Sequence, residues 1–143
     1  IGVNAPIIEN VPPGNKPKYM AAMREGVAHA EGTAMPSQPG NTYLFAHSSL
    51  NFWELGKYAT VFNLLRKVEK GDKITVFYRE NRYDYQVSGK RIVSGFNTEP
   101  LFRRVEEPTL TLQTCHPPGT TLNRLIVTAN LVHSGSWGAN VAQ

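Results

Sequence analysis

Apolar and polar residues alternate along several short segments, and this pattern predicts a protein built mainly of β-strands. The alternation is clear in TYLFAH at residues 42–47, and in ITVFY and YDYQV within residues 74–87. A period of two residues puts successive side chains on opposite faces of a strand. The short link between the last two segments predicts a β-hairpin. The clearest expected strands are 1–9, 42–47, 74–78, 83–87, 109–115 and 123–132.

Two segments have helical spacing instead. KYMAAMREG, residues 18–26, predicts a short helix that ends at its glycine. In the segment 51–68, Phe62, Leu65 and Val68 recur every three residues, which fits the apolar stripe of one helix. These helices are short insertions between strands.

Turn-forming residues separate these elements, because the chain has 10 prolines and 12 glycines. Seven or eight short strands with small helical insertions predict a closed or nearly closed antiparallel β-barrel, and a β-sandwich is the alternative. The segment 26–41 is predicted to be a loop with one short strand, and 101–107 fits either a helical turn or an edge strand. A chain of 143 residues, 41% hydrophobic, suits one domain. We assign residues 1–133 to this domain and the residues 134–143 to a flexible tail.

Charge and composition remove several classes of function. The formal net charge is +4, but the basic residues are scattered and form no basic stripe, so we expect no nucleic-acid partner. No run of eighteen apolar residues is present to form a transmembrane helix. One cysteine excludes an internal disulfide, and one cysteine with four dispersed histidines lacks the ligand spacing of a metal site. We therefore expect no cofactor and no metal.

The single cysteine, Cys115, ends one expected strand, and Arg124 begins the next. The intervening HPPGTTLN contains a Pro-Pro-Gly bend, so the two strands should pair as a hairpin with Cys115 opposite Arg124. Opposed side chains in such a pair have Cβ atoms about 5 Å apart. A thiolate is a nucleophile that a nearby positive charge stabilises, and a guanidinium can hold a developing oxyanion. This pair is therefore a candidate site for nucleophilic catalysis.

Such a site also needs an acid to protonate a leaving group, and histidine is the usual one. His47 ends the strand 42–47, where barrel strands open onto a rim, and is the best candidate. His116 adjoins Cys115, but neighbouring side chains of a strand point to opposite faces. We consider His29, Trp53 and His116 as residues that line a groove.

Five blocks of sequence, in order, resemble the sortase family. TLQTC, residues 111–115, resembles the signature T-L-x-T-C, and Arg124 follows on the next strand. The other blocks are IGVNAPIIE, GVAHAEGTAMPSQPGN, PGNTYLFAHSS and FNLLRKVEKGDKITV. They extend from residue 1 to about residue 132.

The resemblance implies an eight-stranded closed antiparallel β-barrel with short helices, and a cofactor-free cysteine transpeptidase. It implies that Cys115 is the nucleophile, His47 the general acid and Arg124 the cation that orients substrate and stabilises the oxyanion. Thr114 corresponds to a family threonine whose backbone or hydroxyl supports the oxyanion.

The partners that the resemblance implies are surface proteins that carry an LPXTG-like sorting signal, and an amine nucleophile from a peptidoglycan precursor or a pilin lysine. It also implies a membrane anchor upstream of Ile1 and an extracytoplasmic catalytic domain. Two other hypotheses remain. One is a non-catalytic β-barrel peptide-binding module in which Cys115 is a small buried apolar residue. The other is a cysteine peptidase or an L,D-transpeptidase, which TLQTC fits poorly.

Overall fold

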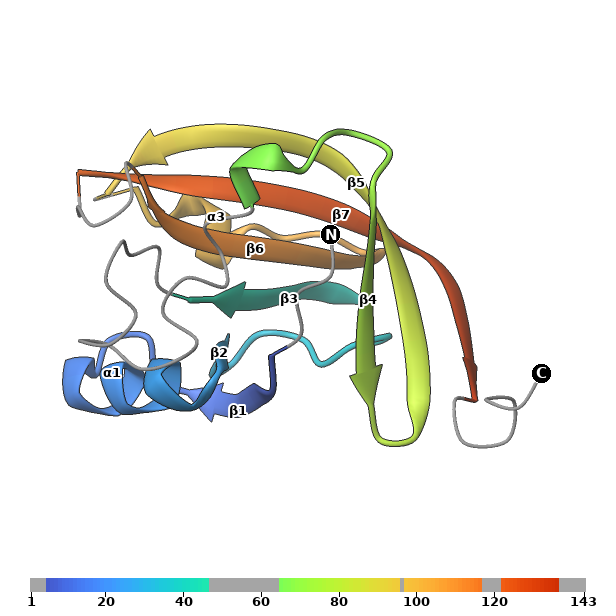
Figure 1. Ribbon diagram of the computed structural model, residues 1–143, viewed down its shortest axis with the longest axis horizontal. Coiled ribbons are helices and arrows are strands. Elements are labelled where there is room, and N and C mark those ends of the chain that lie inside the picture. The colour runs from blue at the N-terminus through green and yellow to red at the C-terminus, as the bar shows by residue number, and fades with distance from the viewer. Residues whose placement is uncertain (1–4, 47–64, 96, 117–121, 137–143) are drawn as a thin grey trace.

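In the described part of the chain, one curled sheet is flanked by the helices α1 and α3 (Figure 1). The computed structural model describes residues 5–46, 65–95, 97–116 and 122–136. Its sheet has seven strands in the order β1-β2-β3-β6-β7-β5-β4. The elements are β1 (Ile7–Val11), α1 (Lys16–Glu25), β2 (Val27–Ala30), β3 (Gly40–Phe45), β4 (Lys73–Tyr78), β5 (Asn81–Ser94), α3 (Glu99–Phe102), β6 (Pro108–His116) and β7 (Asn123–Ser136).

The sheet is mixed, so the prediction of a wholly antiparallel one is wrong. β1 pairs with β2 in parallel, and β3 pairs with β6 in parallel. Parallel neighbours need a crossover connection, and the chain provides two. α1 connects β1 to β2, while the β4–β5 hairpin and α3 lie between β3 and β6.

The described strands form a half-barrel. β1 and β4 lie at the two ends of the sheet order, and neither an eighth strand nor closure is confirmed within the described residues. β5 and β7 are 14 residues each and bend together, as Figure 1 shows. One part of β7 pairs with β6, and its last residues pair with the hairpin end of β5.

Several predicted boundaries shift. The helix predicted at 18–26 is confirmed as α1, and the segment 101–107 contributes a helical turn to α3. β7 continues through Ser136, whose partner is Asn81, so the first residues of the predicted tail belong to the sheet. Residues 137–143 lie outside the described part of the chain, as does most of the helix predicted within 51–68.

Local signals explain where α1 begins and ends. The side chain of Asn15 caps its first turn by accepting a hydrogen bond from the backbone N–H of Lys18 at 3.2 Å, and Pro17 fits the first turn, where no helical N–H bond is lost. At the other end, a Cβ on Gly26 would lie 2.2 Å from the carbonyl oxygen of Pro6. Only glycine therefore allows β1 and β2 to approach this closely.

The two faces of β3 and β6 belong to different apolar clusters. Leu44, Leu110 and Leu112 lie in the larger one, inside the curve of the sheet. Tyr43 and Phe45 lie in the smaller one, which includes Ala22 and Met23 of α1 and packs against Leu101 of α3. Both helices thus cover the second face, which is also the face of Cys115.

Candidate active site

Cys115 and Arg124 are direct partners in the antiparallel pairing of β6 with β7. The predicted hairpin is therefore confirmed. Directly opposed residues point to the same face, with Cβ atoms about 5 Å apart. The thiol and the guanidinium thus emerge side by side at one end of the sheet.

Alternation along β6 fixes which other side chains share this face. Thr111 and Gln113 precede Cys115 by four and two residues, so all three point the same way. Two side-chain hydrogen bonds to β3 agree with this. The Thr111 hydroxyl donates to the Oδ1 atom of Asn41 at 2.6 Å, and the Tyr43 hydroxyl donates to Oε1 of Gln113.

Electrostatics link Arg124 to two groups on this face. Burial raises the pKa of the half-buried Cys115 thiol, and the positive charge of Arg124 opposes part of that increase. Burial also raises the pKa of Tyr43 to about 12, again against the charge of Arg124. The guanidinium is therefore close to both groups.

Thr114 points to the other face and has a different task from the one the resemblance implied for its hydroxyl. Its side chain is 1% exposed, and its hydroxyl donates to the carbonyl oxygen of Ala46 at 3.0 Å. The backbone N–H of Ala46 donates to the carbonyl of Gln113 at 3.2 Å. Since neighbouring side chains in a strand diverge, the hydroxyl is aimed away from the thiol. It ties the end of β3, one residue before His47, to β6.

His29 is buried, so it does not line a groove. Its ring is 1% exposed; Nδ1 accepts from the backbone N–H of Asn10 at 3.1 Å, and Nε2 lies 3.1 Å from the carbonyl of Ala34. Since Nδ1 accepts a hydrogen bond, Nε2 is the protonated nitrogen, and it donates a hydrogen bond to the carbonyl oxygen of Ala34. His29 therefore connects β2 to the turns on either side of it.

Three other predicted residues are only partly placed or not placed. His47 and Trp53 lie outside the described residues. His116 ends β6 opposite Asn123, and its side chain is outside the described part. The alternation of β3 still predicts His47 on the face of Tyr43 and Phe45.

Sequence reasoning missed the Tyr43–Gln113 pair, which borders the thiol and the guanidinium. A signal existed, because Gln113 lies two residues before Cys115 and so shares its face. The pairing of β3 with β6, which brings Tyr43 opposite Thr111, was not readable from the sequence.

A cavity of about 680 Å³ opens between α3 and the turn before β3. The residues that line the cavity are Pro13, Glu31–Ala34, Gln38–Asn41 and Leu101–Val105.

Among the described residues, no three His, Cys, Asp or Glu side chains are grouped to hold a metal ion. Neither described helix is long and apolar enough to span a bilayer.

Comparisons with known proteins agree with this geometry. The family model for the Sortase domain matches residues 1–132. Sortase C-1 from Actinomyces oris superposes with a TM-score of 0.75 at 28% identity, over 92% of this chain and 68% of that one. The pilus-related sortase C of Group B Streptococcus gives 0.76 at 25% identity, over 92% of this chain and 62% of that one.

Sortase A from Listeria monocytogenes gives a TM-score of 0.73 at 20% identity, over 91% of this chain and 79% of that one, and this likeness concerns the fold alone. A search of curated proteins gives no match. The match over residues 1–132 covers both strands of the thiol–guanidinium pair and nearly all of the half-barrel. The chain belongs to the sortase family, whose activity is cysteine transpeptidation.

Proposed function

We propose that this protein cleaves an LPXTG-like sorting signal and transfers the cleaved protein to an amine nucleophile. The observation that carries the proposal is the direct pairing of Cys115 with Arg124 on one face of the β6–β7 hairpin. This pairing places a nucleophile beside a fixed cation, and a cation there can stabilise the oxyanion of acyl transfer.

In the first half-reaction, Sγ of Cys115 attacks the carbonyl carbon before the scissile bond. The proton of the thiol passes to His47, and the tetrahedral oxyanion is held by Arg124. The intermediate collapses when the C–N bond breaks, and His47 protonates the departing amine. A thioester on Cys115 remains.

In the second half-reaction, an amine attacks the thioester while His47 accepts its proton. The new amide bond forms as the C–S bond breaks, the sulfur leaves as the thiolate, and the proton on His47 returns to it. Burial raises the pKa of the Cys115 thiol, so formation of the thiolate needs a proton acceptor, and the proposal gives that role to His47.

The proposed substrates are surface proteins with a carboxy-terminal sorting signal, and the proposed acceptor is a peptidoglycan precursor amine or a pilin lysine. We place the catalytic domain outside the cytoplasm, behind an N-terminal membrane anchor. Tyr43 and Gln113 complete the wall of the site beside the guanidinium.

The test is a sorting-peptide library incubated with the protein and a short amine such as triglycine. We expect cleavage, a product joined to the amine, and a thioester adduct on Cys115 by mass spectrometry. Cys115→Ala should abolish all three while the circular dichroism spectrum is unchanged. Undiminished turnover by Cys115→Ala would refute the assignment. A thiol that methanethiosulfonate labels only after denaturation would instead favour the peptide-binding module.

A further inference from the structure

The cavity beside α3, called here the α3 pocket, is not used by the chemistry described above. Its volume is about 680 Å³, and it lies between residues 101–105 and the segment that leads into β3. Glu31 and Asn41 line it from the β2–β3 side, and Arg103 and Arg104 line it from the α3 side.

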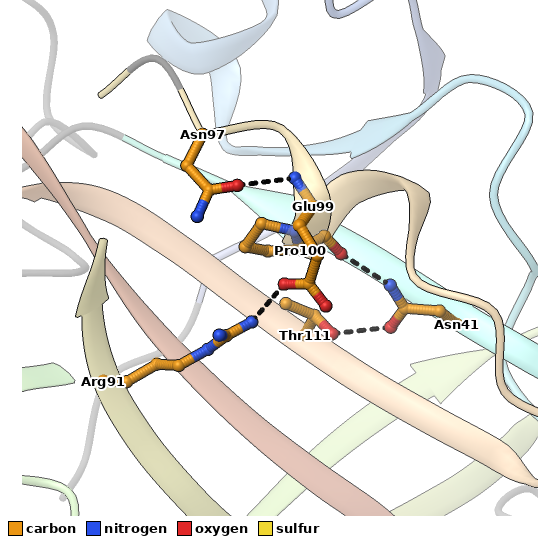
Figure 2. Close-up of polar contacts among 6 residues, drawn as sticks. All are labelled: Asn41, Arg91, Asn97, Glu99, Pro100 and Thr111. Atoms are coloured by element: carbon orange, nitrogen blue, oxygen red, sulfur yellow. Dashed lines mark hydrogen bonds and ion pairs between the residues drawn. The ribbon is translucent and has the colours of Figure 1, made fainter. Parts of the chain in front are cut away.

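One wall of the α3 pocket is fixed in place by a buried amide. Asn41 is 8% exposed, and its carboxamide lies between two partners, as Figure 2 shows. Its Nδ2 donates to the carbonyl of Pro100 at 3.1 Å, while its Oδ1 accepts from the hydroxyl of Thr111 at 2.6 Å. Both bonds are buried, so the amide ties α3 to β3 and β6 at once.

A second attachment connects α3 to β5. Arg91 forms an ion pair with Glu99, and the backbone N–H of Glu99 donates to the side chain of Asn97 at 2.9 Å (Figure 2). Both charged side chains are about half exposed, so this ion pair adds little stability. It nevertheless attaches the start of α3 to a second strand. The pocket wall is therefore formed before any ligand binds.

The α3 pocket and the thiol lie on the same face of β3 and β6. Asn41 touches Thr111, and Thr111 shares its face with Cys115. The backbone partner of Asn41 is Thr109, six residues before Cys115. At about 3.3 Å per residue, the pocket lies about 20 Å from the thiol along the strand. Tyr43 and Thr111, which lie between them on this face, are buried, so a peptide that reaches both has to pass over the side chains that cover the strands. An extended peptide therefore needs six or more residues to connect the thiol and the pocket.

The charges that line the α3 pocket favour an anionic side chain. Arg103 is half-buried and Arg104 is exposed, and neither forms an ion pair with another described residue. Glu31 is the one acidic side chain among the described lining residues, so the two guanidinium groups outnumber it. Phe102, the last residue of α3 and the neighbour of the two arginines in sequence, is 71% exposed and adds an apolar edge.

We propose that the α3 pocket binds an acidic side chain of the sorting peptide, six or more residues from the scissile bond, through Arg103 and Arg104. This inference rests on the proposed function. It adds a recognition element beyond the residues at the cleaved bond, and it predicts which protein substrates are preferred.

The test is a set of sorting peptides in which one glutamate is moved along flanking Gly-Ser segments on both sides of the cleavage site. We expect kcat/KM to peak at one glutamate position, six or more residues away, by about twofold to fivefold over the same peptide with glutamine. The gain should appear in KM and shrink as ionic strength rises, because salt screens exposed charges.

Charge reversal provides the decisive comparison. In Arg103→Glu/Arg104→Glu, the preferred peptide should carry lysine instead of glutamate at the same position, and Arg103→Gln/Arg104→Gln should prefer neither. Arg24→Glu is the matched control, since Arg24 is an exposed cation in the last turn of α1 and does not line the pocket. It should keep the glutamate preference.

Two results are distinguishable. Cleavage that is independent of glutamate position, or a preference that Arg24→Glu also reverses, overturns this inference and leaves the proposed function standing. A failure to cleave any sorting peptide overturns the proposed function and this inference with it.

Discussion

Replacement of Asn41 by alanine tests whether one buried amide holds the wall of the α3 pocket. The change removes two hydrogen bonds and leaves the carbonyl of Pro100 and the hydroxyl of Thr111 without their partner. Each bond contributes about 1 kcal/mol net, and a buried group left unpaired costs about 1–3 kcal/mol. Because Asn41 lines the pocket, water can enter and pair with part of what is exposed. We therefore expect Asn41→Ala to lower the free energy of unfolding by about 2–3 kcal/mol.

The assay is urea unfolding followed by far-ultraviolet circular dichroism, with Thr111→Val and the double variant to complete a cycle. Thr111→Val alone removes one bond and should cost about 1 kcal/mol. The two changes should be non-additive by about 1 kcal/mol, since both remove the same bond. Asn130→Ala, at an exposed position of β7, is the control and should cost under about 0.5 kcal/mol.

The same variant has a kinetic consequence. A loosened α3 should raise KM for peptides that reach the pocket, while kcat and the rate of Cys115 alkylation by iodoacetamide stay as in the parent protein. Strict additivity in the cycle, or a loss below about 0.5 kcal/mol for Asn41→Ala, would refute the reasoning about the amide.

Four further predictions concern the thiol and its neighbours. Arg124→Lys should lose most transpeptidation with the fold retained, because an ammonium cannot reproduce the planar fork of the guanidinium; near-parental kcat/KM in a peptide cleavage assay would contradict this. Burial raises the pKa of Cys115, so its alkylation rate should rise only above the pH at which a free cysteine titrates. Arg124→Gln should move that rise to still higher pH, because the charge of Arg124 lowers the pKa of the thiol. A shift toward lower pH would contradict this role of the charge. Because the pKa of Cys115 is raised, the native state keeps the thiol proton to a higher pH than the unfolded state does. The contribution of Cys115 to the free energy of unfolding should therefore fall as pH rises past the ordinary thiol range. Cys115→Ala should reduce that fall when unfolding in urea is measured at several pH values. Thr114→Val should cost about 1–2 kcal/mol in those melts and lower kcat more than it raises KM, because it frees the end of β3 next to His47; an unchanged kcat would show that the bond to Ala46 matters only for stability.

Local pattern was enough to predict the part of the site that lies within one hairpin. Cys115 and Arg124 are close in sequence, and the alternation of the two segments with the sequence Pro-Pro-Gly between them predicted the pairing that the structure shows. α1 was predictable for the same reason, since the glycine that ends it, Gly26, directly follows its last residue in the sequence.

Features that depend on distant contacts were not predictable in this way. The parallel pairing of β3 with β6 is set by tertiary packing, so the mixed sheet, the Tyr43–Gln113 bond and the Asn41 amide were all missed. His29 shows the same limit. A histidine among small residues looked accessible, yet strands on both sides bury it.

The order in which the chain brings these groups together has a consequence for how the enzyme matures. Arg124 follows Cys115 closely, so their hairpin closes a short loop. Thr114 must meet Ala46 across 68 residues of chain, which is a costlier closure and typical of slow steps in folding. During refolding from urea, the sulfur and its cation should therefore be neighbours well before the segment that leads to His47 arrives. Turnover should then recover later than protection of the β6–β7 amides, and the interval between them measures how long the newly made enzyme carries a reactive pair with no partner to use it.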